Sequence, residues 1–159
     1  MVDNGGSWPV TGRFAVDAVL FTKLGGVLSV LVVKRAKEPF RTAVALPGGF
    51  VEPGERAADA AVRELAEEAG IVVRRDRLRR LGCYRRPGRD PRGQVVSVAY
   101  HGYVSGAPPV VGGSDACAAR WLAVAELQSA DIRVAFDHRD IVSDAVFRRF
   151  GWRPSVLRS

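Results

Sequence analysis

The sequence predicts an α/β fold in which a mixed β-sheet carries helices on both faces. Three observations predict it. β-rich runs stand before and after a central Ala-rich helical segment, a second helical segment comes near the end of the chain, and 47% of the 159 residues are hydrophobic. This length and composition suit one globular domain with a sizeable core. We expect a loose lead over 1–12, a single domain over 13–153 and a tail over 154–159.

The first two β-rich runs predict a hairpin. RFAVDAVLFT (13–22) and VLSVLVVKRA (27–36) are separated by KLGG (23–26), which has the composition of a turn. Pro47-Gly48-Gly49 then predicts irregular backbone, because glycine adopts conformations that other residues avoid. The arginine-rich stretch 74–80 is expected to be a solvated loop leading into a strand. Further strands are expected near 79–85, over 94–104 and around ARWLAV (119–124).

The central helix is expected from about Arg56 to Ala69, with Gly70 as a left-handed C-cap. Its apolar residues recur every four positions, at Ala61, Leu65 and Ala69, so this stripe should face the sheet. Its glutamates should then face a cleft.

The last helical segment is DHRDIVSDAVFRRF (137–150), preceded by the short helical piece AELQ (125–128). Ile141, Ala145 and Phe150 form its expected apolar pattern. Asp137 is expected to be the N-cap and His138 to have a structural role. Together with the strands, these helices predict a layered α/β domain.

The formal charge of +7 favours anionic partners, phosphates among them. Nucleic acid is not indicated, because no aromatic residues are interleaved with a basic stripe. Cys83 and Cys117 stand apart from any CxxC or His neighbour, so they are interpreted as small buried residues in a reducing compartment. No apolar run reaches the ~18 residues of a membrane span, and the first residues lack the features of a signal peptide. We therefore expect no membrane association and a cytoplasmic location.

Negative charge is concentrated in one segment. The chain has seven glutamates, and five of them lie between Glu52 and Glu68. On a helix, Glu64 lies roughly 5–6 Å from both Glu67 and Glu68 at Cβ. Two like charges about 4 Å apart repel by about 4 kcal/mol at an effective dielectric of roughly 20. An acidic surface helix is one interpretation. Oxygen-only clusters also suit hard cations, so Mg²⁺ or Mn²⁺ is the expected ligand.

The same segment carries a motif. From Gly49, five residues lead to Glu55, seven more to Arg63, and RELAEEAGI runs to Ile71. This resembles the Nudix box, G-x5-E-x7-R-E-U-x-E-E-x-G-U with U aliphatic. At about 7% per residue type, the seven fixed letters match by chance on the order of once in 10⁸ starts.

The resemblance implies a Nudix-type α/β/α sandwich with a mixed sheet and a catalytic loop-helix-loop. It implies Mg²⁺-dependent hydrolysis of a nucleoside diphosphate linked to another moiety, with a small nucleotide as the partner; a homodimer stays open. Glu64, Glu67 and Glu68, together with the carbonyl of Gly48, are the implied metal ligands. Glu55 and Arg63 are the implied supporting pair, in which Arg63 holds a ligand carboxylate and Glu55 holds Arg63.

The base that accepts the final proton has two interpretations. Within the box Glu67 or Glu68 could serve. Many relatives instead use an acid on a loop outside it, and GGSDACAARW offers Asp115. A loop aspartate that caps a turn is the alternative for Asp115.

Segments around the box, including VKRAKEPF and PGRDPRGQVVSVAY, resemble the bacterial and archaeal ADP-ribose pyrophosphatase group over about 14–145. The group commonly has Trp where Val44 stands and an acidic loop near Arg85 and Arg86. Guanidinium groups bind phosphate bidentately. The candidate substrate contacts are therefore Arg35, Arg89 and Arg92, with Phe40 as a residue that could stack on a base; ordinary surface arginine is the alternative for each.

ADP-ribose hydrolysis to AMP and ribose 5-phosphate is the leading hypothesis. Hydrolysis of an oxidised or ordinary nucleoside triphosphate, such as 8-oxo-dGTP, is an alternative within the enzyme class. A domain that senses ADP-ribose without cleaving it is an alternative of another class. RNA cap removal is suggested only by the net charge.

Overall fold

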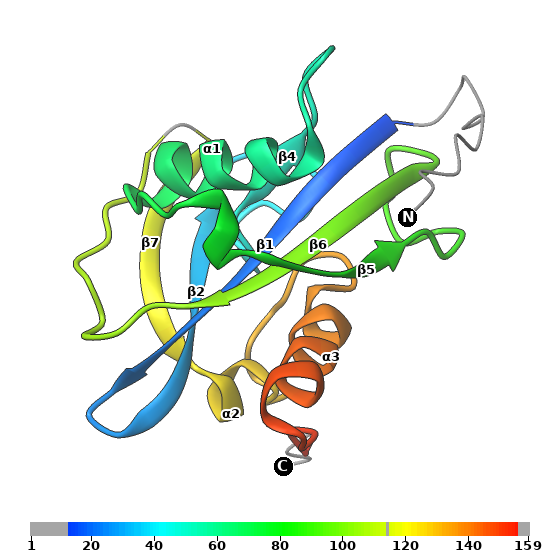
Figure 1. The fold of residues 1–159 in the computed structure, drawn as a ribbon. Coiled ribbons are helices and arrows are strands. Elements are labelled where there is room, and N and C mark those ends of the chain that lie inside the picture. The colour runs from blue at the N-terminus through cyan, green and yellow to red at the C-terminus, as the bar shows by residue number, and fades with distance from the viewer. Residues whose placement is uncertain (1–12, 114, 156–159) are drawn as a thin grey trace.

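The computed structural model describes residues 13–113 and 115–155, so the expected lead and most of the expected tail lie outside the described residues. A mixed sheet lies between helices on its two faces, as Figure 1 shows, which confirms the predicted α/β/α sandwich. Among the described residues, the helices are all too short or too polar to span a bilayer.

Within residues 13–113 and 115–155, the sheet has seven strands and is built around the hairpin predicted at the start of the domain. Strands β1 (Arg13–Leu24) and β2 (Val27–Arg35) pair antiparallel, and β1 also pairs in parallel with β6 (Val95–Tyr103). The order is β3-β2-β1-β6-β5, with β3 at Val44–Ala45 and β5 at Arg79–Tyr84. Off this path, β4 (Gly48–Phe50) pairs with β1, and β7 (Ala116–Ala123) pairs with β2.

The expected strands are present with small shifts at their ends. The Pro47–Gly49 segment, expected to be irregular, contains most of β4, whose three residues are too few for a pattern to reveal. β4 lies directly on β1, with Gly48 opposite Asp17 and Gly49 opposite Val16. A Cβ at Gly48 would lie 2.2 Å from the carbonyl oxygen of Val16, so only glycine permits this close approach.

Helix α1 (Ala57–Ala69) covers one face of the sheet. Gly70 ends it in the left-handed conformation, with φ 66°, as predicted. Ala61, Leu65 and Ala69 are fully buried against β1, β2 and β6, so the predicted stripe does face the sheet. A short 3₁₀ turn, η1 (Arg75–Arg77), follows within the stretch expected to be a loop.

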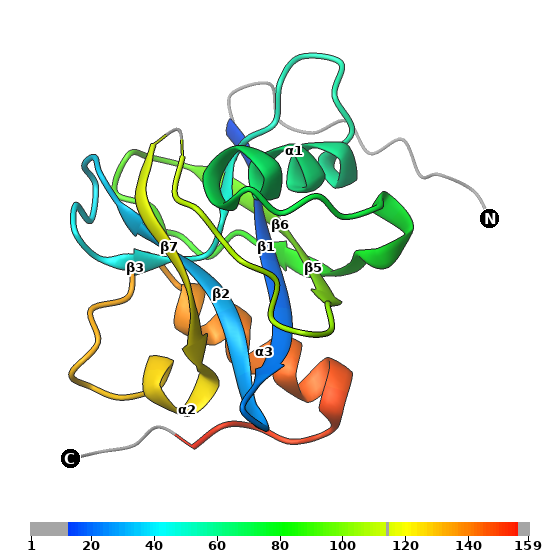
Figure 2. The same ribbon diagram turned by 90° about the vertical axis from the view of Figure 1, so that its left-hand side faces the viewer.

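Helices α2 (Val124–Leu127) and α3 (His138–Phe150) cover the opposite face, as the turned view in Figure 2 shows. Ile141 and Ala145 are fully buried there, as predicted. Phe150 is 37% exposed, so its assignment to the apolar pattern was only partly right. Its ring contacts Phe21 of β1 edge-on, and it is the last residue of the helix.

The prediction of a buried Cys83 was wrong. Cys83 is exposed because it lies on the edge strand β5, and the Arg80 guanidinium donates a hydrogen bond to its Sγ at 2.9 Å. The side chain of Cys117 lies outside the part of the structure that is described.

Candidate active site

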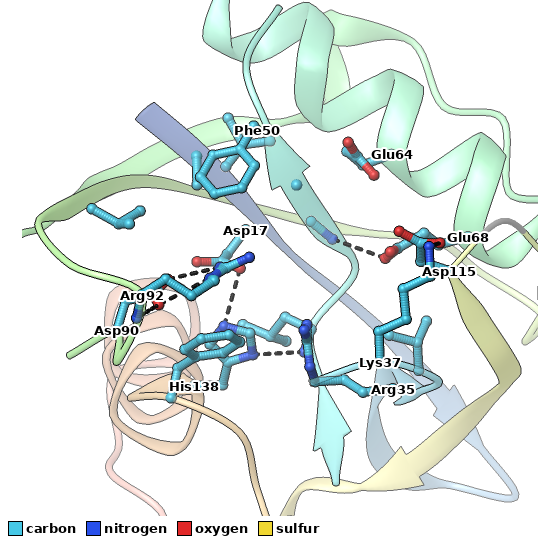
Figure 3. A pocket seen from close by; sticks show the side chains of 18 of the residues that line it. Asp17, Arg35, Lys37, Phe50, Glu64, Glu68, Asp90, Arg92, Asp115 and His138 are labelled. Atoms are coloured by element: carbon cyan, nitrogen blue, oxygen red, sulfur yellow. Dashed lines mark hydrogen bonds and ion pairs between the residues drawn. The ribbon is translucent and has the colours of Figure 1, made fainter. Parts of the chain in front are cut away.

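A pocket of about 490 Å³ opens between α1, the β3–β4 loop and the loop that precedes β6. Figure 3 shows its acidic and basic side chains facing one another. It brings together nine of the eleven residues singled out from the sequence: Arg35, Gly48, Arg63, Glu64, Glu67, Glu68, Arg89, Arg92 and Asp115. Glu55 and Phe40 lie behind its wall.

The acidic wall is the outward face of α1. Glu64 and Glu68 are buried, and Glu67 is 46% exposed at its side chain. Because the apolar stripe of α1 is held on the sheet, these glutamates must face β4. A Cβ at Gly49 would lie 2.2 Å from Oε1 of Glu64, and the amide of Gly48 donates a hydrogen bond to Oε2 of Glu68 at 3.1 Å. Gly49 therefore allows the loop to lie directly against the Glu64 carboxylate, and the Gly48 amide binds Glu68.

Arg63 is the cation at the centre of this wall. Its guanidinium donates two hydrogen bonds to Glu55, at 2.8 and 3.0 Å, and one to Glu64 at 2.8 Å. A longer bond of 3.3 Å reaches Glu67, and another binds the carbonyl of Phe50. The hydrogen bonds to Glu55 raise the pKa of Arg63, and the same bonds lower the pKa of Glu55. Glu55 therefore orients the Arg63 guanidinium, and Arg63 in turn orients the carboxylates of Glu64 and Glu67.

The positive charge of Arg63 does not neutralise the carboxylates of the acidic wall. Burial raises the pKa of Glu64, and burial together with the nearby Glu64 charge raises the pKa of Glu68 to about 8. Such shifts mean that ionised carboxylates are unfavourable in the protein by itself. A divalent cation would favour the ionised form, and carboxylate and main-chain carbonyl oxygens are the donors that Mg²⁺ and Mn²⁺ prefer.

The carboxylates have the oxygen donors that such an ion prefers, but their side chains are not arranged around one point as metal ligands. In the described ranges, no three acidic, histidine or cysteine side chains converge closely enough to hold a metal. Arg63 draws Glu64 and Glu67 to one side, and Glu68 turns to the amide of Gly48. Binding an ion would therefore require these side chains to turn toward one another.

The basic wall lies opposite and centres on Phe136. The guanidinium of Arg35 lies 5.0 Å from the ring centroid of Phe136, and that of Arg92 lies 5.5 Å from it. Arg92 also lies 4.9 Å from the ring of Phe50 and is held by two hydrogen bonds to Asp90, at 3.0 and 2.7 Å. Burial and the charge of Arg92 lower the pKa of Arg35. Two guanidinium groups that repel each other on one ring favour an anion between them.

Phe40, expected to contact substrate, lies behind this wall and packs edge-on against Phe136 at 4.8 Å. Both residues have positive φ, 60° for Phe40 and 52° for Phe136. A bulky residue rarely adopts this conformation, and such strain clusters at functional sites. Phe136 lines the pocket together with Phe50, and the sequence analysis did not single it out.

Arg89 was expected to contact substrate from an exposed loop, but it is buried. Its guanidinium donates hydrogen bonds to both carboxylate oxygens of Asp137, at 2.9 and 2.7 Å, and lies 3.7 Å from Asp17. Asp137 is at the N-cap position of α3, as predicted, but its side chain binds Arg89 and makes no cap hydrogen bond. Arg89 therefore supports the floor of the pocket.

Asp115 lies at the rim, on the loop where it was expected. Its carboxylate pairs with Lys37 at 2.6 Å, and both side chains are mostly exposed. The pair leaves acceptor capacity on the Asp115 carboxylate, since Lys37 contacts Oδ1.

Asp17, which the sequence analysis missed, and His138, for which it expected a structural role, form the floor. Nε2 of His138 lies 3.1 Å from Oδ1 of Asp17, and Nδ1 accepts a hydrogen bond from the amide of Leu46 at 2.9 Å. Ser97 also donates a hydrogen bond to Asp17. One signal could have revealed Asp17: it is a charged residue within the apolar run FAVDAVLF.

Comparisons with known proteins identify the family and relatives of this chain. A family model described as "NUDIX domain" matches residues 11–145. An ADP-ribose pyrophosphatase of Methanocaldococcus jannaschii is 41% identical over 115 residues, which are 72% of this chain and 64% of that protein. The "ADPR responsive transcriptional repressor NtrR" of Acinetobacter baylyi is 30% identical over 135 residues, 84% of this chain and 52% of that protein.

The chain thus spans less than two thirds of the length of these two curated relatives. Among solved structures, the NUDIX domain of Shewanella oneidensis NrtR in complex with ADP ribose has a TM-score of 0.77 and 30% identity. That match covers 85% of this chain and 86% of the other.

Proposed function

Since this chain belongs to the NUDIX domain family, we propose that it hydrolyses the diphosphate bond of ADP-ribose, giving AMP and ribose 5-phosphate, with a divalent cation. The observation that carries the proposal is the pocket with one carboxylate wall and one guanidinium wall. A diphosphate needs cations on both sides, and this pocket offers arginines on one side and cation ligands on the other.

Glu64, Glu67 and Glu68, with the carbonyl of Gly48, would hold Mg²⁺ or Mn²⁺. Such an ion, when bound, withdraws charge from the diphosphate oxygens and lowers the pKa of a water molecule. Arg63 orients two of these carboxylates through its bonds to Glu64 and Glu67.

On the opposite side, Arg35 and Arg92 would bind the diphosphate. Asp90 and the rings of Phe136 and Phe50 fix their guanidinium groups. Because these groups are oriented before substrate arrives, less conformational freedom is lost on binding.

The proton of the attacking water needs an acceptor within hydrogen-bonding reach. Asp115, whose carboxylate pairs with Lys37 through Oδ1, is one candidate. Glu67 or Glu68 is the other. Replacement of Asp115 separates these two mechanisms.

The choice of ADP-ribose rests on the similar proteins and on the basic wall. One relative is an ADP-ribose pyrophosphatase, and one structural neighbour was solved with ADP ribose. Arg35 and Arg92 occur in the two stretches that resemble that group.

The test is an incubation of the purified protein with Mg²⁺ or Mn²⁺ and a panel of ADP-ribose, sugar nucleotides, dinucleotides and triphosphates, with products identified by chromatography. We expect AMP and ribose 5-phosphate from ADP-ribose, and loss of the reaction in EDTA. Cleavage of triphosphates with ADP-ribose left intact would overturn the proposal in favour of nucleotide-pool cleaning.

A second candidate is a domain that binds ADP-ribose as a signal, suggested by the similarity to an ADPR-responsive repressor. Calorimetry with ADP-ribose distinguishes it. Tight binding without cleavage, in the presence of Mg²⁺, would favour the sensing function.

A further inference from the structure

The buried pair Asp17–His138 is hydrogen-bonded to the main chain just before β4, at the amide of Leu46. His138 is the first residue of α3, and it reaches across the end of the sheet to the amide of Leu46, two residues before Gly48. Asp17 is on β1, directly opposite Gly48. Both side chains are more than nine-tenths buried and line the pocket floor. Figure 3 shows His138 beneath Asp17, with a dashed line between them.

The hydrogen bonds define the protonation of the ring. The Leu46 amide is a donor, so Nδ1 of His138 must be the unprotonated acceptor, and Nε2 carries the proton that faces Asp17. Oδ1 of Asp17 accepts from His138, Oδ2 accepts from Ser97, and the Arg89 guanidinium lies 3.7 Å from Oδ2. Asp17 therefore fixes the tautomer of His138 that the Leu46 amide requires.

The loop from Leu46 to Gly49 is held at three successive residues. The Leu46 amide donates to His138, the Pro47 carbonyl accepts from the Ala18 amide at 2.8 Å, and the Gly48 amide donates to Glu68. Only the bond to His138 comes from the helix layer on the far side of the sheet. Together with the pairing of β4 and β1, it holds the carbonyl of Gly48 and the peptide of Gly49 near the glutamates of α1.

We propose that His138, oriented by Asp17, is a positioning residue that holds the Leu46–Gly49 loop against the carboxylate wall. It does not touch the reacting atoms. The proposal rests on the proposed hydrolase function for its kinetic consequence, but its structural part, the hold on Leu46, does not depend on that function.

The first arm of the test uses the unmodified protein. A ¹⁵N NMR experiment should show His138 with Nδ1 unprotonated, Nε2 protonated, and a scalar coupling across the hydrogen bond from the Leu46 amide to Nδ1. Absence of the coupling, or the opposite tautomer, would overturn the proposal without any variant.

The second arm compares His138→Leu, which removes both ring nitrogens, with His138→Asn, whose carbonyl can still accept a bond from Leu46. Tyr84→Phe is the matched control, since it removes a different bond between the sheet and α3, from the Tyr84 hydroxyl to Asp144, away from the pocket. For His138→Leu we expect exchange of the Leu46 amide to accelerate at least tenfold more than that of Val19 in the centre of β1.

The same substitution should lower kcat for ADP-ribose at least tenfold while KM changes less than threefold. His138→Asn should recover part of both losses, and Tyr84→Phe should reproduce neither. Equal acceleration at Leu46 and Val19, no recovery in His138→Asn, or the same kinetic loss in Tyr84→Phe would reduce His138 to a general contributor to stability. If the unmodified protein cleaves no ADP-ribose, the proposed function fails, and the NMR and exchange measurements still decide the positioning role.

Discussion

Removing the charge of Glu68 should stabilise the metal-free protein, and more so as pH rises. Glu68 is 9% exposed, lies beside Glu64 and has a pKa raised from 4.5 to about 8. Since folding raises this pKa, the folded state binds a proton that the unfolded state releases between about pH 4.5 and 8. Stability attributable to this group therefore falls as pH rises through that window.

A carboxyl with these two pKa values costs the folded state about 1 kcal/mol at pH 5 and about 4 kcal/mol at pH 8. Glutamine keeps the shape and an oxygen that can accept the bond from the Gly48 amide. In EDTA, we expect Glu68→Gln to melt about 10 °C above the unmodified protein at pH 8 and only slightly above it at pH 5.

The assay is thermal unfolding followed by circular dichroism at pH 5, 6.5 and 8. Burial lowers the pKa of His101, so its contribution to stability increases with pH, in the opposite direction. It is the same in both proteins and cancels in the difference. The lowered pKa of Asp17 acts below its ordinary value of 3.8, outside the pH range of the assay. Glu67→Gln is the control, because that side chain is 46% exposed and should give a much smaller change.

Addition of Mg²⁺ should reverse the order of the two melting temperatures. An ion that binds only the folded state stabilises it, and the unmodified protein, which keeps the Glu68 carboxylate, should bind Mg²⁺ more tightly than Glu68→Gln. The difference in melting temperature between Glu68→Gln and the unmodified protein could stay the same from pH 5 to pH 8, or Glu68→Gln could melt lower at pH 8. Either result would refute the claim that the ionised Glu68 carboxylate destabilises the metal-free protein.

Three further outcomes are expected. Asp115→Asn should lower kcat more than it changes KM, as for loss of a proton acceptor; unchanged kcat in steady-state kinetics would return the base role to Glu67 or Glu68. Gly49→Ala should abolish measurable turnover while circular dichroism stays native, because its Cβ would displace the Glu64 carboxylate; wild-type activity would contradict the close approach. ADP-ribose should be cleaved with a higher kcat/KM than 8-oxo-dGTP or dGTP under identical Mg²⁺. A tenfold preference for a triphosphate, about 1.4 kcal/mol, would reverse that assignment.

The parts of the site that lie close together in the chain could be predicted. The spacing from Gly49 to Ile71 indicates a loop and a helix with its glutamates on one side, and α1 has them there. The bonds from Arg63 to Glu55 and Glu64 follow the roles that the family resemblance implies. The family itself is confirmed by the match over 11–145.

The parts that depend on distant segments could not be predicted. The parallel pairing of β1 with β6 brings the loop before β6 next to the start of α3, and no local pattern contains that pairing. For this reason Arg89 was expected at the surface, although Asp137, 48 residues away, holds it in the interior. The contact between His138 and Leu46 spans 92 residues and is hidden for the same reason.

The two faces of helix α1 are under different selection, one for stability and one for activity. Substitutions at Ala61 or Leu65 would be judged by selection for a folded, abundant protein, since these side chains are fully buried against the sheet. At Glu64 or Glu68, selection for stability and selection for activity oppose each other. A neutral side chain there relieves repulsion and stabilises the fold, but it removes a group proposed to bind a cation. In a laboratory library screened only for heat resistance, the acidic wall should therefore be among the first features lost, and its retention requires selection for activity.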